Sequence, residues 1–404
     1  MTEQEPAFDL LLQGGHVVDP GNNIFGRTDV AIKDGKIAAI SPDIDTSSAA
    51  KTVNVDGLYV TPGLIDIHVQ VLAYGAWTFP DEYALPNGIT TVADAGGAGW
   101  RNFEEWKAAV IDKARTRVLV LLNIVGAGML GTVEQDTSEM QPEPCAQMVQ
   151  RHRDVIVGIK AAHHDGPGWE SVDGAVAAAE LSDTFAMIDY HRHPNRTYRE
   201  LLLEHMRPGD TLTHMYGMGT EIVDGLVIPG RHPQLLDDSD KIHDFVLEAR
   251  RRGVRFDVGH GGGSFWFRIA KPCMDQGFGP DTISTDVHKG SFFLLRATMP
   301  ITMSKLMNLG MSLNEAVDRS TRAPAEQIGR PDLGSLSVGA DADVAVFELE
   351  RGEFGFTDSG LARLKGDRRL LCQMTIRAGN VVWDLNGLSR PDWETQGDYV
   401  RIED

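Results

Sequence analysis

The sequence has few cysteines, few basic residues and no apolar run long enough to cross a membrane. Its three cysteines, Cys145, Cys273 and Cys372, are an odd number, lie far apart and form no CxxC pair. This pattern argues against a disulfide framework and favours a reducing cytoplasm. The longest apolar stretch, residues 118–130, contains Asn123 and is shorter than the roughly 20 residues that a spanning helix needs. The acidic N-terminus has no basic segment before an apolar one, so no signal peptide is expected.

Basic residues are outnumbered by acidic ones. The 404 residues include 38 Lys and Arg against 58 Asp and Glu, for a formal net charge of -20. This balance argues against nucleic acid and anionic membrane surfaces as partners, because both reward clustered basic residues. A hydrophobic content of 42% and a charged content of 24% are typical of a globular protein. We therefore expect a cytoplasmic enzyme that acts on a small molecule. A homo-oligomer is also expected, since symmetric dimers are common.

Both ends of the chain are predicted to form short β-strands. Near the N-terminus, Asp34-Gly35 separates the apolar segments 29–33 and 36–40, and Asp-Gly between two such runs is a strong hairpin signal. Near the C-terminus, residues 343–347 and 374–377 have strand-like patterns. Neither end alone has enough strands to close a core. We predict a small β-sandwich-like domain built from residues 1–60 and 333–404.

The middle of the chain alternates short apolar runs with longer helical or loop stretches. This alternation is typical of buried parallel strands in an α/β protein. Eight strands in about 270 residues match a (β/α)₈ (TIM) barrel, here predicted over residues 61–332. The predicted strands are residues 64–68, 90–94, 117–124, 154–160, 185–191, 211–214, 255–260 and 282–286.

Five predicted strands end in a residue type that can bind a metal. These residues are His68, Lys160, His191, His214 and Asp286. The carboxyl ends of all barrel strands open on one face, so residues far apart in sequence would meet there. A single histidine at a strand end is more often structural. The joint pattern is harder to explain in that way, and it indicates an active site.

Several short motifs accompany these strand ends. The first strand contains PGLIDIH at residues 62–68, and the strand of Lys160 ends in GIK at residues 158–160. Further motifs are residues 208–214 (PGDTLTH), 256–264 (FDVGHGGGS), 281–288 (DTISTDVH) and 334–343 (GSLSVGADAD). Together they resemble the amidohydrolase superfamily, and in particular its dihydroorotase-like metallo-deacetylase branch, in which GIK looks like the strand of the bridging lysine. The resemblance extends over nearly the whole chain.

The resemblance implies a metal centre and a role for each ligand. Lys160 would be N-carboxylated and bridge two divalent metals, most simply zinc. His191 and His214 would hold the more exposed metal, and His68 and Asp286 the other, with Asp286 also moving a proton. Neutral imidazole is a good zinc ligand. Free lysine, with a pKa near ~10.4, would repel a metal until CO₂ converts it to a carbamate.

Gln70 departs from the family pattern, which has His-x-His on the first strand. Residues 68 and 70 point to the same side of a strand, so Gln70 takes the place of the second histidine. An amide oxygen binds zinc less well than imidazole does. Three interpretations stay open. The centre holds one metal on Lys160, His191 and His214, or it holds two with Gln70 as a poor ligand, or the hydrolytic chemistry has been lost.

Five further residues are candidate substrate contacts. His163 and His164 follow the lysine strand, and Arg192 is a possible anchor for a carboxylate or phosphate. His260 precedes three glycines, and His288 could orient Asp286 or the substrate. For each, the alternative is an ordinary structural or solvated side chain.

The function that these features favour is metal-dependent hydrolysis of an amide or ester bond in a small acylated substrate. An N-acyl amino acid or an acylated hydroxy acid fits the resemblance best. The alternatives are a single-metal lyase or isomerase that acts on a carbonyl compound, and a non-catalytic homologue.

Overall fold

Seven parallel strands form the central sheet of the computed structural model, which describes residues 6–72, 77–223 and 226–399. Their spatial order is β16-β13-β12-β11-β10-β9-β8. The order follows the chain, as expected when each strand is joined to the next by a helical crossover. The strands are β8 (Leu64–Val69), β9 (Ile89–Gly99), β10 (Arg117–Asn123), β11 (Ile156–Ala161), β12 (Phe185–Ile188), β13 (Thr211–Leu212) and β16 (Arg255–Phe256).

Residues 281–287 close this sheet into a barrel. Thr282 pairs in parallel with Asp257 on one side, and Val287 pairs in parallel with Val69 on the other. The Val258 N–H donates to the Thr282 carbonyl at 3.1 Å, and the Gln70 N–H donates to the Val287 carbonyl at 3.0 Å. The segment thus occupies the place of the eighth strand, and the predicted (β/α)₈ fold is confirmed.

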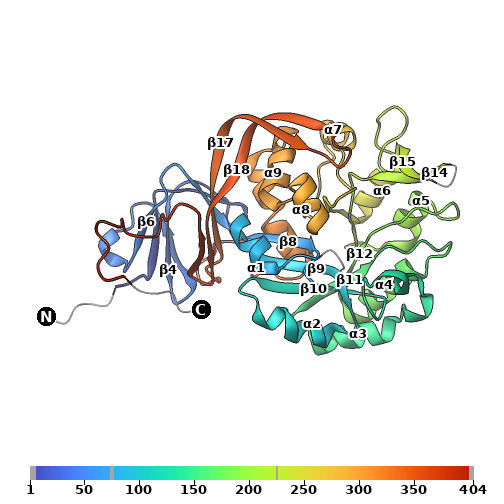
Figure 1. Cartoon of the computed structure of the whole chain (residues 1–404), viewed down its shortest axis with the longest axis horizontal. Helices are drawn as coiled ribbons and strands as arrows, with labels where there is room; N and C mark the ends of the chain where they lie inside the picture. The colour runs from blue at the N-terminus through green and yellow to red at the C-terminus, as the bar shows by residue number, and fades with distance from the viewer. Residues whose placement is uncertain (1–5, 73–76, 224–225, 400–404) are drawn as a thin grey trace.

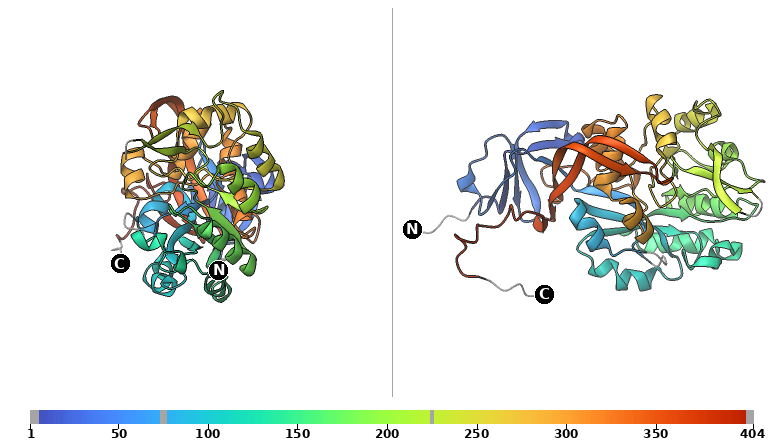
Figure 2. Two further views of the ribbon diagram at one scale, coloured as in Figure 1. Left: turned by 90° about the vertical axis from the view of Figure 1, so that its right-hand side faces the viewer. Right: turned by 45° about the horizontal axis from the view of Figure 1, so that its top comes forward.

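Helices surround the barrel and cover its apolar strands (Figures 1 and 2). A capping box begins α10 (Leu313–Asp318), because the Ser312 side chain accepts from the Glu315 N–H while the Glu315 carboxylate accepts from the Ser312 N–H. None of the helices in the described ranges is long and apolar enough to cross a lipid bilayer. The helices are α1 (Pro80–Ala84), α2 (Phe103–Ala109), α3 (Pro142–Arg151), α4 (Glu170–Ser182), α5 (Tyr198–Glu200), α6 (Asp244–Arg252), α7 (Phe267–Asp275), α8 (Lys289–Leu295), α9 (Met299–Asn308), α10 (Leu313–Asp318) and α11 (Arg322–Gln327).

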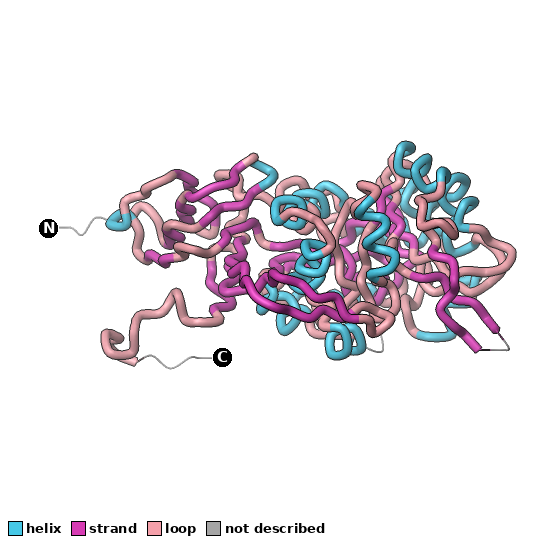
Figure 3. The backbone as a smooth tube through the Cα atoms, turned by 90° about the horizontal axis from the view of Figure 1, so that it is seen from above, coloured by secondary structure: helices cyan, strands magenta, loops and turns pink. Residues whose placement is uncertain are grey.

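Two further sheets lie at the other end of the molecule, where Figure 3 shows a second set of magenta strands on the left. One has the order β5-β4-β1-β6, and the other has the order β19-β18-β17-β7-β2-β3 and so combines strands from both ends of the chain. A β-rich unit built from both termini is therefore confirmed, whereas its borders near residues 60 and 333 stay a prediction. The strands are β1 (Leu10–Gln13), β2 (His16–Asp19), β3 (Ile24–Arg27), β4 (Asp29–Lys33), β5 (Lys36–Ser41), β6 (Thr52–Asn54), β7 (Tyr59–Pro62), β17 (Val344–Thr357), β18 (Arg363–Arg377) and β19 (Asn380–Asp384).

The hairpin of β17 and β18 is longer than the sequence predicts. It extends past the β-rich unit and lies along α9 on the barrel, as the orange-red ribbon in Figure 1 shows. Leu370 and Cys372, which lie in the extended part of this hairpin, are buried in the same apolar core as the barrel strands. The extension therefore buries apolar surface that a short hairpin would leave exposed. A second, separate hairpin pairs β14 (Met218–Val223) with β15 (Leu226–Pro233) beyond β13.

Candidate metal centre

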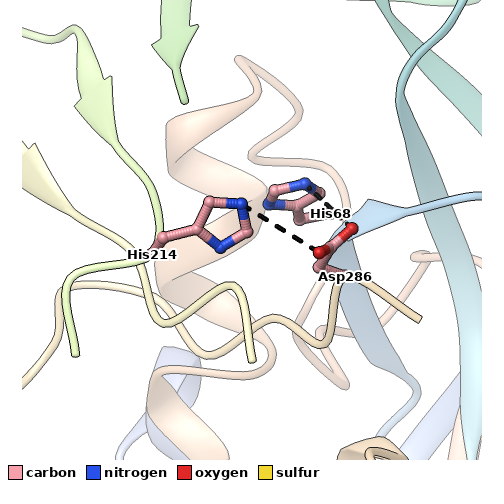
Figure 4. Close-up of side chains that lie close together, drawn as sticks. All are labelled: His68, His214 and Asp286. Atoms are coloured by element: carbon pink, nitrogen blue, oxygen red, sulfur yellow. Dashed lines mark ion pairs between the residues drawn. The ribbon is translucent and has the colours of Figure 1, made fainter. Parts of the chain in front are cut away.

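Three of the predicted ligands lie together at the carboxyl ends of the barrel strands. His68 belongs to β8, His214 follows β13, and Asp286 lies in the segment that closes the barrel. One ligand atom of each lies within 4.8 Å of the others. His68 Nε2 is 3.4 Å from Asp286 Oδ1, and His214 Nε2 is 4.0 Å from Asp286 Oδ2. Figure 4 shows both rings pointing toward this carboxylate.

Hydrogen bonds at Nδ1 hold both imidazole rings in place. His68 Nδ1 lies 2.8 Å from Thr213 Oγ1, whose hydroxyl donates to the buried Asp257 carboxylate at 2.8 Å. His214 Nδ1 lies 2.6 Å from the Gly259 carbonyl, so this nitrogen carries the proton. In both rings Nε2 is the atom that faces Asp286. A fixed Nδ1–H with Nε2 directed into the site is the arrangement of a metal-binding histidine.

Lys160 approaches the same group from β11. Its side chain is 1% exposed, and Nζ lies 3.2 Å from His68 Nε2. Gly96 makes room for the lysine stem, because a Cβ at that position would lie 2.7 Å from Lys160 Cγ. Burial lowers the pKa of Lys160, and it also lowers the pKa of His68 together with the nearby lysine charge.

Gln70 has a defined role at the edge of this group. Its side-chain amide nitrogen donates to Asp286 Oδ1 at 3.1 Å. Its buried Oε1 has no hydrogen-bond partner among the described residues. A buried acceptor without a donor is costly, and a nearby cation would satisfy it. With two imidazoles and a carboxylate beside it, the residues fit a divalent metal.

Asp189 is a site residue that the sequence reasoning missed. It directly follows β12, which ends at Ile188 rather than at His191 as predicted. Asp189 Oδ2 lies 3.3 Å from His214 Nε2, the position where His191 was expected. The alternation of side chains along a strand could have indicated Asp189. Residues 189 and 191 point to the same side of an extended chain, and residue 189 is nearer the strand. His191 instead lies in a second group with His163 and Asp189.

Asp189 and His214 stabilise each other's charged forms. Burial acts to lower the pKa of His214, but the Asp189 charge and hydrogen bond outweigh it and raise that pKa to about 9. Burial acts to raise the pKa of Asp189, but the charge of His214 holds it well below its usual range. A divalent cation would take the place of the imidazole proton in balancing Asp189.

The remaining predicted contacts lie outside the two groups. His260 is fully buried, with Nδ1 2.9 Å from the Gly261 carbonyl and Nε2 2.6 Å from Lys305 Nζ, so its polar atoms are engaged within the protein. His288 caps α8 by accepting from the Gly290 N–H at 3.2 Å. His164 is buried, with Nε2 3.7 Å from Glu170 Oε2.

Arg192 borders the open side of the site. It lines a cavity of about 230 Å³ that also touches Asp189, His191, His214 and Ser264. The role of Arg192 as an anchor for an anionic substrate group stays a prediction.

Strained backbone marks the site. His163, His214 and Asp286 have φ values of 54°, 61° and 43°, in the left-handed region that side chains other than glycine avoid. Such unfavourable backbone conformations are found where surrounding contacts hold them in place, and they are most frequent at functional sites.

Comparison with known proteins identifies the family. Residues 59–382 match the amidohydrolase family. The chain belongs to this family. It is 33% identical to a deacetylase of Enterococcus faecalis over 371 residues, which cover 88% of this chain and 94% of that protein. It is 29% identical to a deacetylase of Agrobacterium fabrum over 355 residues, covering 84% and 83% of the two chains.

Solved structures agree with this assignment. A crystal structure described as an adenine deaminase superposes with a TM-score of 0.82 at 30% identity, covering 93% of this chain and 100% of the other. One described as a dihydroorotase gives 0.81 at 28% identity, covering 93% and 99%. The predicted dihydroorotase-like deacetylase branch is thus confirmed, and the protein is a hydrolytic enzyme of a metal-dependent family.

Proposed function

We propose that this amidohydrolase removes an acyl group from a small molecule by cleaving an amide or ester bond with water. The observation that carries the proposal is the convergence of His68, His214 and Asp286 within 4.8 Å of one another beside buried Lys160. Those four residues would hold the metal, with zinc the ion that best suits imidazole ligands. The substrate that the family resemblance favours is an N-acyl amino acid or an acylated hydroxy acid.

A divalent metal in this group supplies Lewis-acid activation of water and of the scissile carbonyl. The protein's own residues do the rest. Thr213 and Gly259 fix the rings of His68 and His214. Asp286 is 15% exposed at its side chain, so it reaches both the group and the solvent side. It is placed to take a proton from the attacking water and pass it to the leaving group.

Lys160 would act as a carbamate. Its neutral amine adds to CO₂, an N–C bond forms, one proton is released, and the product is an anionic carbamate with two oxygens. Nζ lies 3.2 Å from His68 Nε2, so the new carboxylate would sit inside the ligand group. The predicted pairing of His191 with His214 is replaced in this proposal by Asp189 and His214, which are 3.3 Å apart.

A substrate panel separates this proposal from its rivals. Release of the acyl acid from N-acyl amino acids or acylated hydroxy acids supports hydrolysis. Solvent deuterium entering a carbonyl substrate without cleavage indicates the lyase or isomerase alternative. Because two structural relatives are described as an adenine deaminase and a dihydroorotase, the panel includes adenine and dihydroorotate. A folded, zinc-loaded protein that converts none of these compounds contradicts the proposal.

Lys160→Ala should remove the metal held with His68, His214 and Asp286 and lower kcat/KM by more than about 100-fold, because that group loses a ligand inside a buried cavity. Metal content by elemental analysis and single-substrate kinetics measure the two effects. Lys113→Ala, at an exposed lysine of the barrel surface, serves as the matched control and should change neither. Full metal content and full activity in Lys160→Ala would rule out the carbamate role.

The proposal includes a cytoplasmic, homo-oligomeric enzyme. All three cysteines are buried as free thiols, which suits a reducing compartment. Size-exclusion chromatography with light scattering measures the oligomeric state.

A further inference from the structure

His163, Asp189 and His191 form a compact group beside the first one. His163 lies two residues after β11, and Asp189 and His191 follow β12. One ligand atom of each lies within 4.8 Å of the others. The two imidazole rings are 5.2 Å apart between centroids. These loops follow neighbouring parallel strands, so the barrel itself brings the three residues together.

Each histidine of this group is oriented by a carboxylate. His163 Nδ1 lies 2.8 Å from Glu134 Oε2, and His191 Nδ1 lies 2.9 Å from Asp165 Oδ1. On the other side of its ring, His163 Nε2 lies 3.6 Å from Asp189 Oδ2. Metal-binding histidines commonly donate their second ring nitrogen to a carboxylate, which fixes the tautomer and makes the imidazole more basic.

The loop that carries these partners is itself held in place. Gln135 belongs to a 3-10 turn (Gly131–Gln135). Its side-chain nitrogen donates to the His163 carbonyl at 2.6 Å, and its side-chain oxygen accepts from the Asp165 N–H at 2.9 Å. Glu134 in the same turn is 6% exposed. The buried Glu134 carboxylate is thus built into the structure, whereas the Asp165 side chain that meets His191 is 71% exposed and its residue is held through its backbone N–H.

Asp189 lies between the two groups. Its Oδ2 is 3.3 Å from His214 Nε2 and 3.6 Å from His163 Nε2. Both contacts are made by this one oxygen, and a carboxylate can serve two neighbouring cations. Three carboxylates, Glu134, Asp165 and Asp189, surround the two imidazoles, and a dication would balance that charge.

We propose that His163, Asp189 and His191 bind a second divalent cation, with Asp189 shared between this site and the one at His68, His214 and Asp286. Two imidazoles and one carboxylate favour a borderline ion such as Zn²⁺, Mn²⁺ or Fe²⁺ over Mg²⁺ or Ca²⁺. Three protein ligands would leave room for water or substrate, and Asp189 and His191 line the same cavity as Arg192. The proposal extends the proposed function, since the first site is the catalytic one in that scheme.

The test counts zinc ions per chain in the full-length protein after zinc loading and removal of loose metal. Wild type should hold two ions, and His163→Asn should hold one. His193→Asn is the matched control, two residues beyond His191 and outside both groups, and should hold two. His68→Asn should keep the second ion while losing the first. Circular dichroism confirms that each variant is folded.

Glu134→Gln keeps the shape of the orienting side chain and avoids any loss of a ligand. It should weaken zinc binding at one site by about 10- to 100-fold, measured by competition with a chromophoric chelator, and leave the other site unchanged. One ion in both wild type and His163→Asn overturns the second site and leaves the proposed function standing. One ion in wild type and none in His163→Asn supports this site but contradicts the first. No ion in wild type overturns both.

Discussion

Contacts with Gly261 and with the His68 carbonyl determine the position of Asp286. Gly261 has a φ of 50°, and a Cβ there would lie 2.5 Å from Asp286 Oδ2. Asp286 is itself held at a φ of 43° by its N–H, which donates to the His68 carbonyl at 2.6 Å. The closure of the barrel thus fixes the backbone of Asp286, so a clash at residue 261 would have to be relieved by turning the carboxylate out of its present position. A side chain at residue 261 would push against the proposed proton acceptor directly.

Gly261→Ala should lower kcat on the preferred substrate by about 100-fold, because displacement of a reacting group by about 1 Å has an effect of that size. Bound metal should fall as well. Gly263→Ala is the matched control in the same loop, since a Cβ added there would have no heavy atom within 4 Å, and it should keep wild-type kinetics. Wild-type kinetics in Gly261→Ala would show that Asp286 tolerates the shift.

At the scale of elements, α9 is the barrel helix that carries the long hairpin. Ser304 Oγ accepts from the Leu370 N–H at 2.9 Å, and Asn308 donates to the Arg368 carbonyl at 2.8 Å. The same helix buries Lys305, whose Nζ contacts His260 at 2.6 Å. Burial lowers the pKa of Lys305 to about 7. Burial of a charged Lys305 would therefore destabilise the folded protein. The lysine lies where α9 contacts both the hairpin and the loop that follows β16.

The lowered pKa of Lys305 predicts that the free energy of unfolding depends on pH. The unfolded chain protonates Lys305 at its ordinary pKa of 10.5, whereas the folded chain does so only near pH 7. The unfolded state therefore binds more protons between these values, and stability contributed by this group rises with pH across the interval. Relative to Lys305→Met, wild type should gain on the order of 2 kcal/mol of unfolding free energy between pH 7 and pH 9.

Urea denaturation of both proteins at the two pH values measures this gain. Lys289→Met, at an exposed lysine on the neighbouring helix α8, is the control and should show the same difference from wild type at both pH values. An equal difference at both pH values for Lys305→Met as well would mean that Lys305 is charged in the folded protein throughout.

At the scale of the whole molecule, Arg117 joins the barrel to the β-rich sheets. It starts β10 and donates to Asp343 Oδ2 at 2.7 Å and to Asp341 Oδ2 at 2.7 Å. Arg377 of β18 donates to Asp343 Oδ1 at 3.1 Å. The arginine is 13% exposed at its side chain, so its loss would leave carboxylates partly buried without their partner.

Arg117→Met should lower the free energy of unfolding by about 2 to 3 kcal/mol, as for other charged hydrogen bonds in partly buried places. Chemical denaturation followed by circular dichroism measures the change. Arg27→Met provides a comparison, because its pair with Asp56 at 3.4 Å is highly exposed on both sides, and such pairs contribute little. Equal stability of Arg117→Met and wild type would show that the ion pairs of Arg117 do not stabilise the contact between the barrel and the β-rich sheets.

Sequence patterns are enough to predict the barrel, the β-rich unit from both ends and the meeting of four candidate metal ligands at one face. Apolar runs at regular intervals indicate buried parallel strands, and all strands of a barrel open on one face. For that reason His68, Lys160, His214 and Asp286 could be placed together although they are far apart in the chain.

Where each strand stops, and which side chains then meet, depends on the tertiary packing. β12 ends at Ile188, so Asp189 rather than His191 lies beside His214. His260 ends a predicted strand but turns to Lys305 of α9, a contact over 45 positions of sequence. Such outcomes depend on packing between distant segments, which local periodicity does not encode. The alternation of side chains fixes the direction in which a residue points, whereas the neighbours that fill the space around it decide what it touches.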